Sequence, residues 1–248
     1  MSIGTLGHDN ARYPFVLTMS VCLLAAAAWL ALWTMGASAH APMHHHHHPG
    51  MAMSEPTPLV SMSLFVLSWT IMTIAMMLPT SLPVLATFAT IARGRGDRAL
   101  LVALVVAGYL VAWAIFGAAA WLGQRVAPGI PLGGTVILLL AGAYQFTPLK
   151  HRCLEKCRSP LSFVMEHWQG RHHWRQALKL GLDHGVFCVG CCWALMLLMF
   201  VVGMTNLAWM LGLAVLMAIE KNSRFGNRLS APVGVVLLAW GAATLVSF

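Results

Sequence analysis

The sequence predicts an all-α fold, a polytopic transmembrane helical bundle of about seven spans that forms one integral membrane domain over residues 1–248. Two observations of composition support this prediction. Hydrophobic residues make up 59% of the chain and charged residues only 9%, whereas soluble domains carry about 25% charged residues. The apolar residues also form long runs, most of them near the roughly 20 residues that a transmembrane helix needs. We therefore expect no separate soluble domain.

The apolar runs are read in chain order from their lengths and flanks. They cover residues 14–36, 59–80, 99–123, 131–148, 181–203, 206–220 and 232–248. Pro79 and Pro83 should break the second run, because proline ends or kinks helices. The sixth run is short, with about 15 residues, and six spans result if the last two runs form a re-entrant element. Ala37-Ser38-Ala39 resembles a signal-peptidase site, but the apolar core before it is too long for a signal peptide.

The basic residues give the orientation. Fourteen of the 15 Lys and Arg fall in alternate connections, and only Arg125 lies on the other side. Because positive residues favour the cytoplasm, we expect a multi-pass protein of a bacterial inner membrane with a cytoplasmic N-terminus and an external C-terminus. The net charge of +8 therefore reflects membrane topology and does not indicate nucleic-acid binding.

The first external loop, residues 37–58, is rich in metal-binding side chains. It contains His40, Met43, His44, His45, His46, His47, His48, Met51 and Met53. Imidazole and thioether donors suit copper, and imidazole alone also suits zinc. An engineered tag and a flexible polar loop without a defined ligand stay open as alternatives. We interpret the loop as an accessory metal-gathering segment.

The fifth run carries the densest chemistry. On a helix, His184, Cys188, Cys191 and Cys192 share one stripe. Soft sulfur and imidazole donors on one face favour Cu(I), or zinc as a second choice. Buried structural thiols are the simpler alternative.

Further candidates should reach the same depth from other segments. Cys153 and Cys157, spaced i, i+4, lie in the basic connection 149–180, which we expect on the cytoplasmic side. Met72 and Met76 approach from the second run, and Glu220 ends the sixth. One helix cannot surround a metal ion, so a second segment must add ligands, and the 149–180 cysteines are the thiols best placed to do so. Incidental loop cysteines, methionine packing and an interfacial Glu220-Lys221 charge pair are the respective alternatives.

These stretches resemble a family of bacterial integral membrane proteins described as metal-binding by prediction. The shared pieces are W-T-I-M-T-I-A-M-M-L-P (69–79), Y-Q-F-T-P-L-K-H-R-C-L-E-K-C-R-S-P (144–160), G-V-F-C-V-G-C-C-W-A-L-M (185–196) and Glu220-Lys221. The resemblance covers most of the chain from Ser61 onward, without the His-rich loop. It implies metal binding within a membrane.

The sequence thus favours a membrane protein that handles a soft metal in transport, sensing or loading of a metalloprotein. Its expected partners are the lipid bilayer, the metal ion, and a copper enzyme or membrane complex. One alternative is a thiol-disulfide or quinone-linked oxidoreductase that uses the C-x-x-C pair Cys188/Cys191. Another is a structural subunit of a larger complex. No nucleotide-binding motif argues for primary active transport, and the enzyme alternative stays open.

Overall fold

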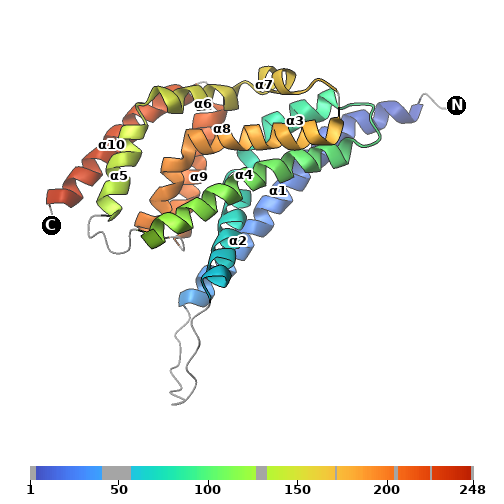
Figure 1. Cartoon of the computed structure of the whole chain (residues 1–248). Coiled ribbons are helices and arrows are strands. Elements are labelled where there is room, and N and C mark those ends of the chain that lie inside the picture. Colours follow the sequence, from blue (N-terminus) through green and yellow to red (C-terminus); the bar gives the residue numbers. More distant parts are fainter. Residues whose placement is uncertain are drawn as a thin grey trace, which may run out of the picture.

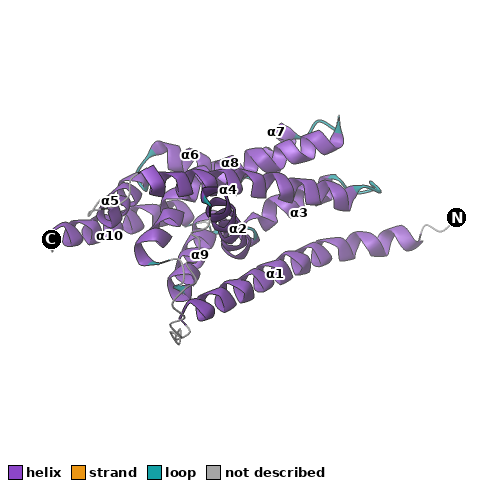
Figure 2. Cartoon of the chain, turned by 60° about the horizontal axis from the view of Figure 1, so that its bottom comes forward, coloured by secondary structure: helices purple, strands orange, loops and turns teal. Residues whose placement is uncertain are grey.

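The computed structural model describes residues 4–40, 57–126, 133–170, 172–203, 206–223 and 225–246. These residues are helical apart from short connections, and they include no strand (Figure 2). The predicted all-α bundle is confirmed. The long helices cross one another, and shorter helices cap one end of the assembly (Figure 1).

The elements follow each other as helices with short connections. They are α1 (Gly4–His40), α2 (Pro58–Met76), the 3₁₀ turn η1 (Pro79–Ser81), α3 (Leu82–Ile91), α4 (Arg98–Val126), α5 (Gly133–Tyr144), α6 (Pro148–Arg158), α7 (Pro160–His167), α8 (His173–Val202), α9 (Leu207–Asn222) and α10 (Gly226–Val246). Each of the apolar runs lies largely in a helix. The helix that contains the fifth run begins earlier than expected. The amphipathic segment His173–Leu180 extends α8 by two turns before the run.

Among the residues that the structure describes, five helices are long and apolar enough to cross a membrane. They contain the stretches Tyr13–Gly36, Pro58–Met76, Arg98–Val126, His173–Val202 and Arg228–Val246. Helices α5 and α9 have only 12 and 16 residues, less than a full bilayer crossing. The segment 149–180, expected as a loop, folds largely into α6, α7 and the start of α8.

The basic connections gather at one end of the bundle. Helices α3, α6 and α7 lie along this end in Figure 1, together with the beginning of α1. The last turn of α1 and the first turn of α2 lie at the opposite end. The guanidinium Nη2 of Arg158 in α6 donates to the carbonyl oxygen of Ser223, 2.6 Å away, just after α9. The elements that carry most of the Lys and Arg residues therefore meet on one side.

Helix α8 is held at the centre by a close crossing with α4. A Cβ atom added to Gly181 would lie 2.0 Å from the carbonyl oxygen of Val105, and one on Gly108 would lie 2.2 Å from that of Leu178. Small residues allow membrane helices to approach this closely. The crossing fixes which face of α8 is buried, and that face carries the cysteines.

The end of α2 is broken, as Pro79 and Pro83 predicted. The carbonyl of Thr73 accepts hydrogen bonds from the backbone N–H groups of both Met77 and Leu78, and the 3₁₀ turn follows. The break turns Met77, Thr80 and Ser81 into the bundle, where all three are buried. It thereby places polar and sulfur groups of α2 and η1 against α8 and α9.

Candidate metal centre

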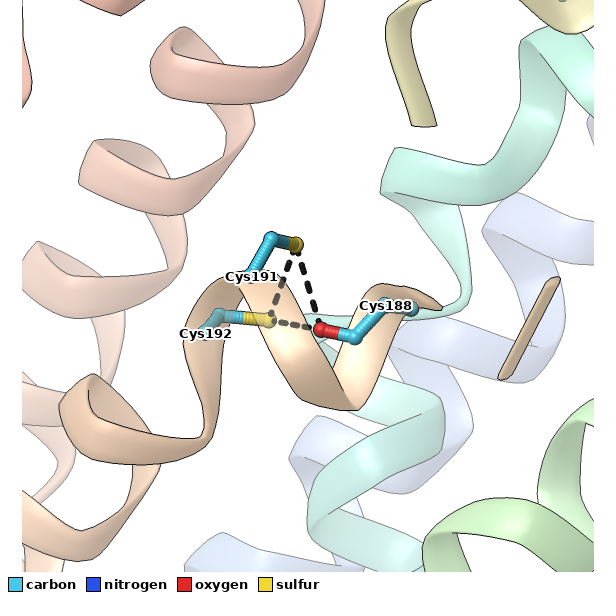
Figure 3. A group of neighbouring side chains, drawn as sticks. All are labelled: Cys188, Cys191 and Cys192. Carbon is cyan, nitrogen blue, oxygen red and sulfur yellow. Dashed lines mark hydrogen bonds between the residues drawn. The ribbon is translucent and has the colours of Figure 1, made fainter. Parts of the chain in front are cut away.

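The centre begins with three cysteines on the buried face of α8. The sulfurs of Cys188, Cys191 and Cys192 lie within 4.8 Å of one another. The Cys191 and Cys192 sulfurs are 3.7 Å apart, and both thiols are directed at the carbonyl oxygen of Cys188, at 3.1 and 2.8 Å (Figure 3). All three side chains are buried, so the helix presents converging sulfurs inside the bundle.

Two more sulfurs join from other segments. Cys157 Sγ of α6 lies 4.0 Å from Cys191 Sγ, and Met77 Sδ lies 3.8 Å from Cys192 Sγ. Two sulfurs that bind one ion at about 2.3 Å each cannot be more than about 4.6 Å apart. Both pairs satisfy this limit. We call Cys157, Cys188, Cys191, Cys192 and Met77 the sulfur cluster.

Cys153 takes a different place from Cys157. It packs against Gly190, where an added Cβ would lie only 2.6 Å from its sulfur. Burial raises the pKa of the Cys153 thiol, which keeps it protonated near neutral pH. Of the two α6 cysteines, the structure therefore brings Cys157 to the α8 sulfurs, with Cys191 as its neighbour.

A buried lysine, which the sequence interpretation did not include in the site, faces the cluster. Lys221 Nζ lies 2.9 Å from Cys188 Sγ, 3.3 Å from Thr80 Oγ1 and 3.5 Å from Met77 Sδ. The hydroxyl of Tyr109 lies 3.1 Å from the same Cys188 sulfur. A buried ammonium is costly unless it faces negative charge, so Lys221 stabilises negative charge on Cys188. The available signal was a lysine in the last turn of an otherwise apolar helix.

Glu220 does not join the sulfurs. Its carboxylate accepts from Lys150 Nζ at 2.8 and 3.0 Å and from Ser230 Oγ at 2.9 Å. Lys150 Nζ also contacts Gln145 Oε1. The Glu220 carboxylate is thus occupied by a buried ion pair that joins α6, α9 and α10. Glu220 and Lys221 also do not form the interfacial charge pair of the alternative interpretation. Glu220 binds Lys150, whereas Lys221 lies against Cys188.

His184 forms part of the wall beside the cluster. Its Nε2 lies 3.3 Å from Ser81 Oγ. The ring stacks on Tyr109, with a centroid distance of 5.6 Å, and meets Phe163 edge-on at 5.5 Å. Nδ1 is buried without a hydrogen-bond partner among the described residues. His184 therefore keeps one nitrogen available, although its recorded contacts are to Ser81 and aromatic rings.

The methionine that reaches the cysteines is the residue after the two predicted ones. Met72 and Met76 are buried in α2, and Met72 lines an apolar pocket with Leu32 and Phe65. The thioether that reaches a cysteine belongs to Met77. The outer-loop candidates Met43, His44, His45, His46, His47, His48, Met51 and Met53 lie outside the described residues, as does the side chain of His40.

Residues 66–244 match a family profile described as PpoB2, copper chaperone. The chain belongs to this copper chaperone family. The matched region includes every member of the sulfur cluster and Lys221, and it begins after the outer loop. No curated protein and no solved structure matches the chain significantly. Membership confirms the expectation of a metal-binding family, and together with the three clustered cysteines it supports copper handling.

Proposed function

We propose that this protein is a membrane copper chaperone, which holds Cu(I) as cargo on the sulfur cluster and passes it to a copper enzyme. The observation that carries the proposal is the spacing of four sulfurs from three segments, with successive separations of 4.0, 3.7 and 3.8 Å. Three sulfurs arranged trigonally at about 2.3 Å from one ion are about 4.0 Å apart. The cluster therefore needs little rearrangement to bind a metal.

The donor types favour Cu(I) over zinc. Cu(I) prefers soft thiolate and thioether ligands, whereas a structural zinc site is closed by four nitrogen, oxygen or thiolate donors. Met77 supplies a thioether at 3.8 Å from Cys192. A set of cysteines completed by methionine suits a soft monovalent ion, and zinc is the alternative that the experiment below tests.

Lys221 suits a site that accumulates thiolates. Each thiolate adds a negative charge and Cu(I) adds one positive charge, so a complex with two or three thiolates is anionic. Excess charge is costly in the apolar interior of a protein. The ammonium 2.9 Å from Cys188 offsets part of that charge. We propose Lys221 as a positioning and charge-compensating residue, not as a metal ligand.

We propose a bacterial inner membrane with a cytoplasmic N-terminus as the setting. The basic elements at one end of the bundle support this orientation by the positive-inside tendency. Residues 1–248 then act as one membrane domain, with α6 and α7 on the cytoplasmic side. In this arrangement the His- and Met-rich segment 37–58 faces the outside, and we propose it as an accessory metal-gathering segment, because imidazole and thioether donors suit copper.

The proposal is tested by metal binding and delivery. The full chain purified in detergent should take up Cu(I) in preference to zinc when both are offered. Cells without the protein should lose copper-enzyme activity in their membranes, and added copper should restore it, because excess metal bypasses a chaperone. Preferential zinc binding, or a loss that added copper does not restore, would contradict the proposal.

The lysine gives a residue-level prediction. Lys221→Met should weaken Cu(I) binding about 10- to 100-fold, the range found for groups that support metal ligands. Lys221→Arg, which keeps the charge, should lose less. The measurement is competition with a chromogenic Cu(I) chelator. The control is Lys179→Met, because Lys179 is exposed on the first turns of α8. Equal affinities in Lys221→Met and wild type would rule out charge compensation.

A further inference from the structure

The members of the sulfur cluster differ in their access to the surface. Cys157 is half-buried, whereas Cys188, Cys191, Cys192 and Met77 are almost completely buried. The short contacts run from Cys157 to Cys191, then to Cys192 and then to Met77. The sulfurs thus form a path from the α6 surface into the interior, and each successive pair is close enough to share one ion.

The position of Cys157 is fixed from both sides. Lys150, two turns before it, forms the buried ion pair with Glu220. Arg158, directly after it, donates to the Ser223 carbonyl at 2.6 Å. Tyr144, just before α6, donates to the Gly190 carbonyl of α8 at 2.5 Å. These anchors hold a partly accessible thiol beside Cys191 without burying it.

We propose that Cys157 is the exchange residue of the cluster, the thiol through which Cu(I) enters from or leaves to a thiolate copper carrier. The inference rests on the proposed function, since it assumes that the cluster holds copper. Cys191 and Cys192 are then the holding ligands, and Cys157 is the sulfur that an incoming carrier meets first. The carrier is defined by its chemistry as a Cu(I) thiolate, whether a small thiol or a cysteine pair of a protein.

The exchange step is a ligand substitution without a change of oxidation state. The Cys157 thiol gives its proton to solvent as its sulfur bonds to the carrier-held Cu(I). The copper–sulfur bond to the carrier then breaks, and the released thiolate takes up a proton. Cu(I) next bonds to Cys191 Sγ, 4.0 Å from Cys157 Sγ, as the Cys191 thiol loses its proton, and the Cys157 thiolate released from copper takes up a proton. Copper remains monovalent throughout, and each thiol that binds copper loses one proton while each thiolate that releases copper gains one.

Stopped-flow measurements on the full chain in detergent test this assignment. The probes are Cu(I)–glutathione and Cu(I) bound to a soluble Cys-x-x-Cys peptide, which separate small-thiol from protein-type carriers. Cys157→Ser should slow copper uptake at least about tenfold from one or both probes. Its equilibrium affinity, measured against a Cu(I) chelator, should stay within about threefold of wild type, because the holding ligands Cys191 and Cys192, 3.7 Å apart, remain in place. Cys153→Ser is the matched control on the same helix and should exchange at the wild-type rate.

The possible outcomes separate this inference from the proposed function. If wild type binds no Cu(I), the proposed function fails. If wild type binds and Cys157→Ser exchanges at the same rate with both probes, the exchange role is overturned. A large loss of equilibrium affinity in Cys157→Ser would make Cys157 a holding ligand and also overturn it. Cys157→Met, which keeps a soft donor, should recover part of the uptake rate, and a rate equal to that of Cys157→Ser would contradict the proposal.

Discussion

Replacing Cys191 by serine should lower the Cu(I) affinity at least about 1,000-fold, a loss of about 4 kcal/mol. Cys191 is the only residue of the described part of the chain with short sulfur contacts to both Cys157, at 4.0 Å, and Cys192, at 3.7 Å. The substitution therefore removes a member shared by two potential ligand pairs. A serine hydroxyl is a hard oxygen donor and binds Cu(I) poorly. Competition with a chromogenic Cu(I) chelator measures the loss.

The control for this experiment is another cysteine of the same chain. Cys22→Ser changes an exposed cysteine on α1, outside the family match at residues 66–244. It should leave the affinity unchanged. If Cys191→Ser binds as tightly as Cys22→Ser, the cluster is a set of structural thiols. The C-x-x-C redox alternative would then gain support.

The three α8 cysteines could be found from the sequence because their relation is local. Helical geometry alone places Cys188, Cys191 and Cys192 on one face. That face is buried because Gly108 and Gly181 let α4 and α8 approach closely. The sequence also predicts that a cysteine of α6 lies close to the α8 cysteines. Which α6 cysteine reaches α8 depends on how α6 is anchored, and this is tertiary information.

Met77 and Lys221 could not be assigned from periodicity. The pattern of Met72 and Met76 assumes that α2 continues as a regular helix, but the helix ends at Met76 and the 3₁₀ turn redirects the next side chain. Lys221 faces Cys188 only because of how α9 packs against α8. Glu220, the neighbouring residue, points to Lys150 instead. Adjacent helical residues diverge by about 100°, so the carboxylate and the ammonium serve two separate networks.

Breaking the buried ion pair between Lys150 and Glu220 should lower the stability of the protein more than breaking any other polar contact. Glu220→Gln leaves the Lys150 ammonium fully buried without a carboxylate, because both side chains are almost completely inaccessible in the native protein. Removing one partner of a buried pair typically costs about 3–5 kcal/mol. For a chain of this length we expect the melting temperature in detergent to fall by roughly 6–20 °C. Glu166→Gln, which breaks the exposed pair with Lys156, should melt like wild type.

A double variant separates the unpaired charge from the loss of the contact itself. Lys150→Met with Glu220→Leu replaces the ion pair by apolar groups of similar size, and such replacements are often neutral or stabilising. It should therefore melt well above Glu220→Gln. The same variant tests whether the pair only positions α6, because Cys157 should keep its copper exchange rate if apolar packing holds the helix equally well. If Glu220→Gln melts like wild type, Lys150 has another compensating partner, and the ion pair does not anchor the helix that carries Cys157.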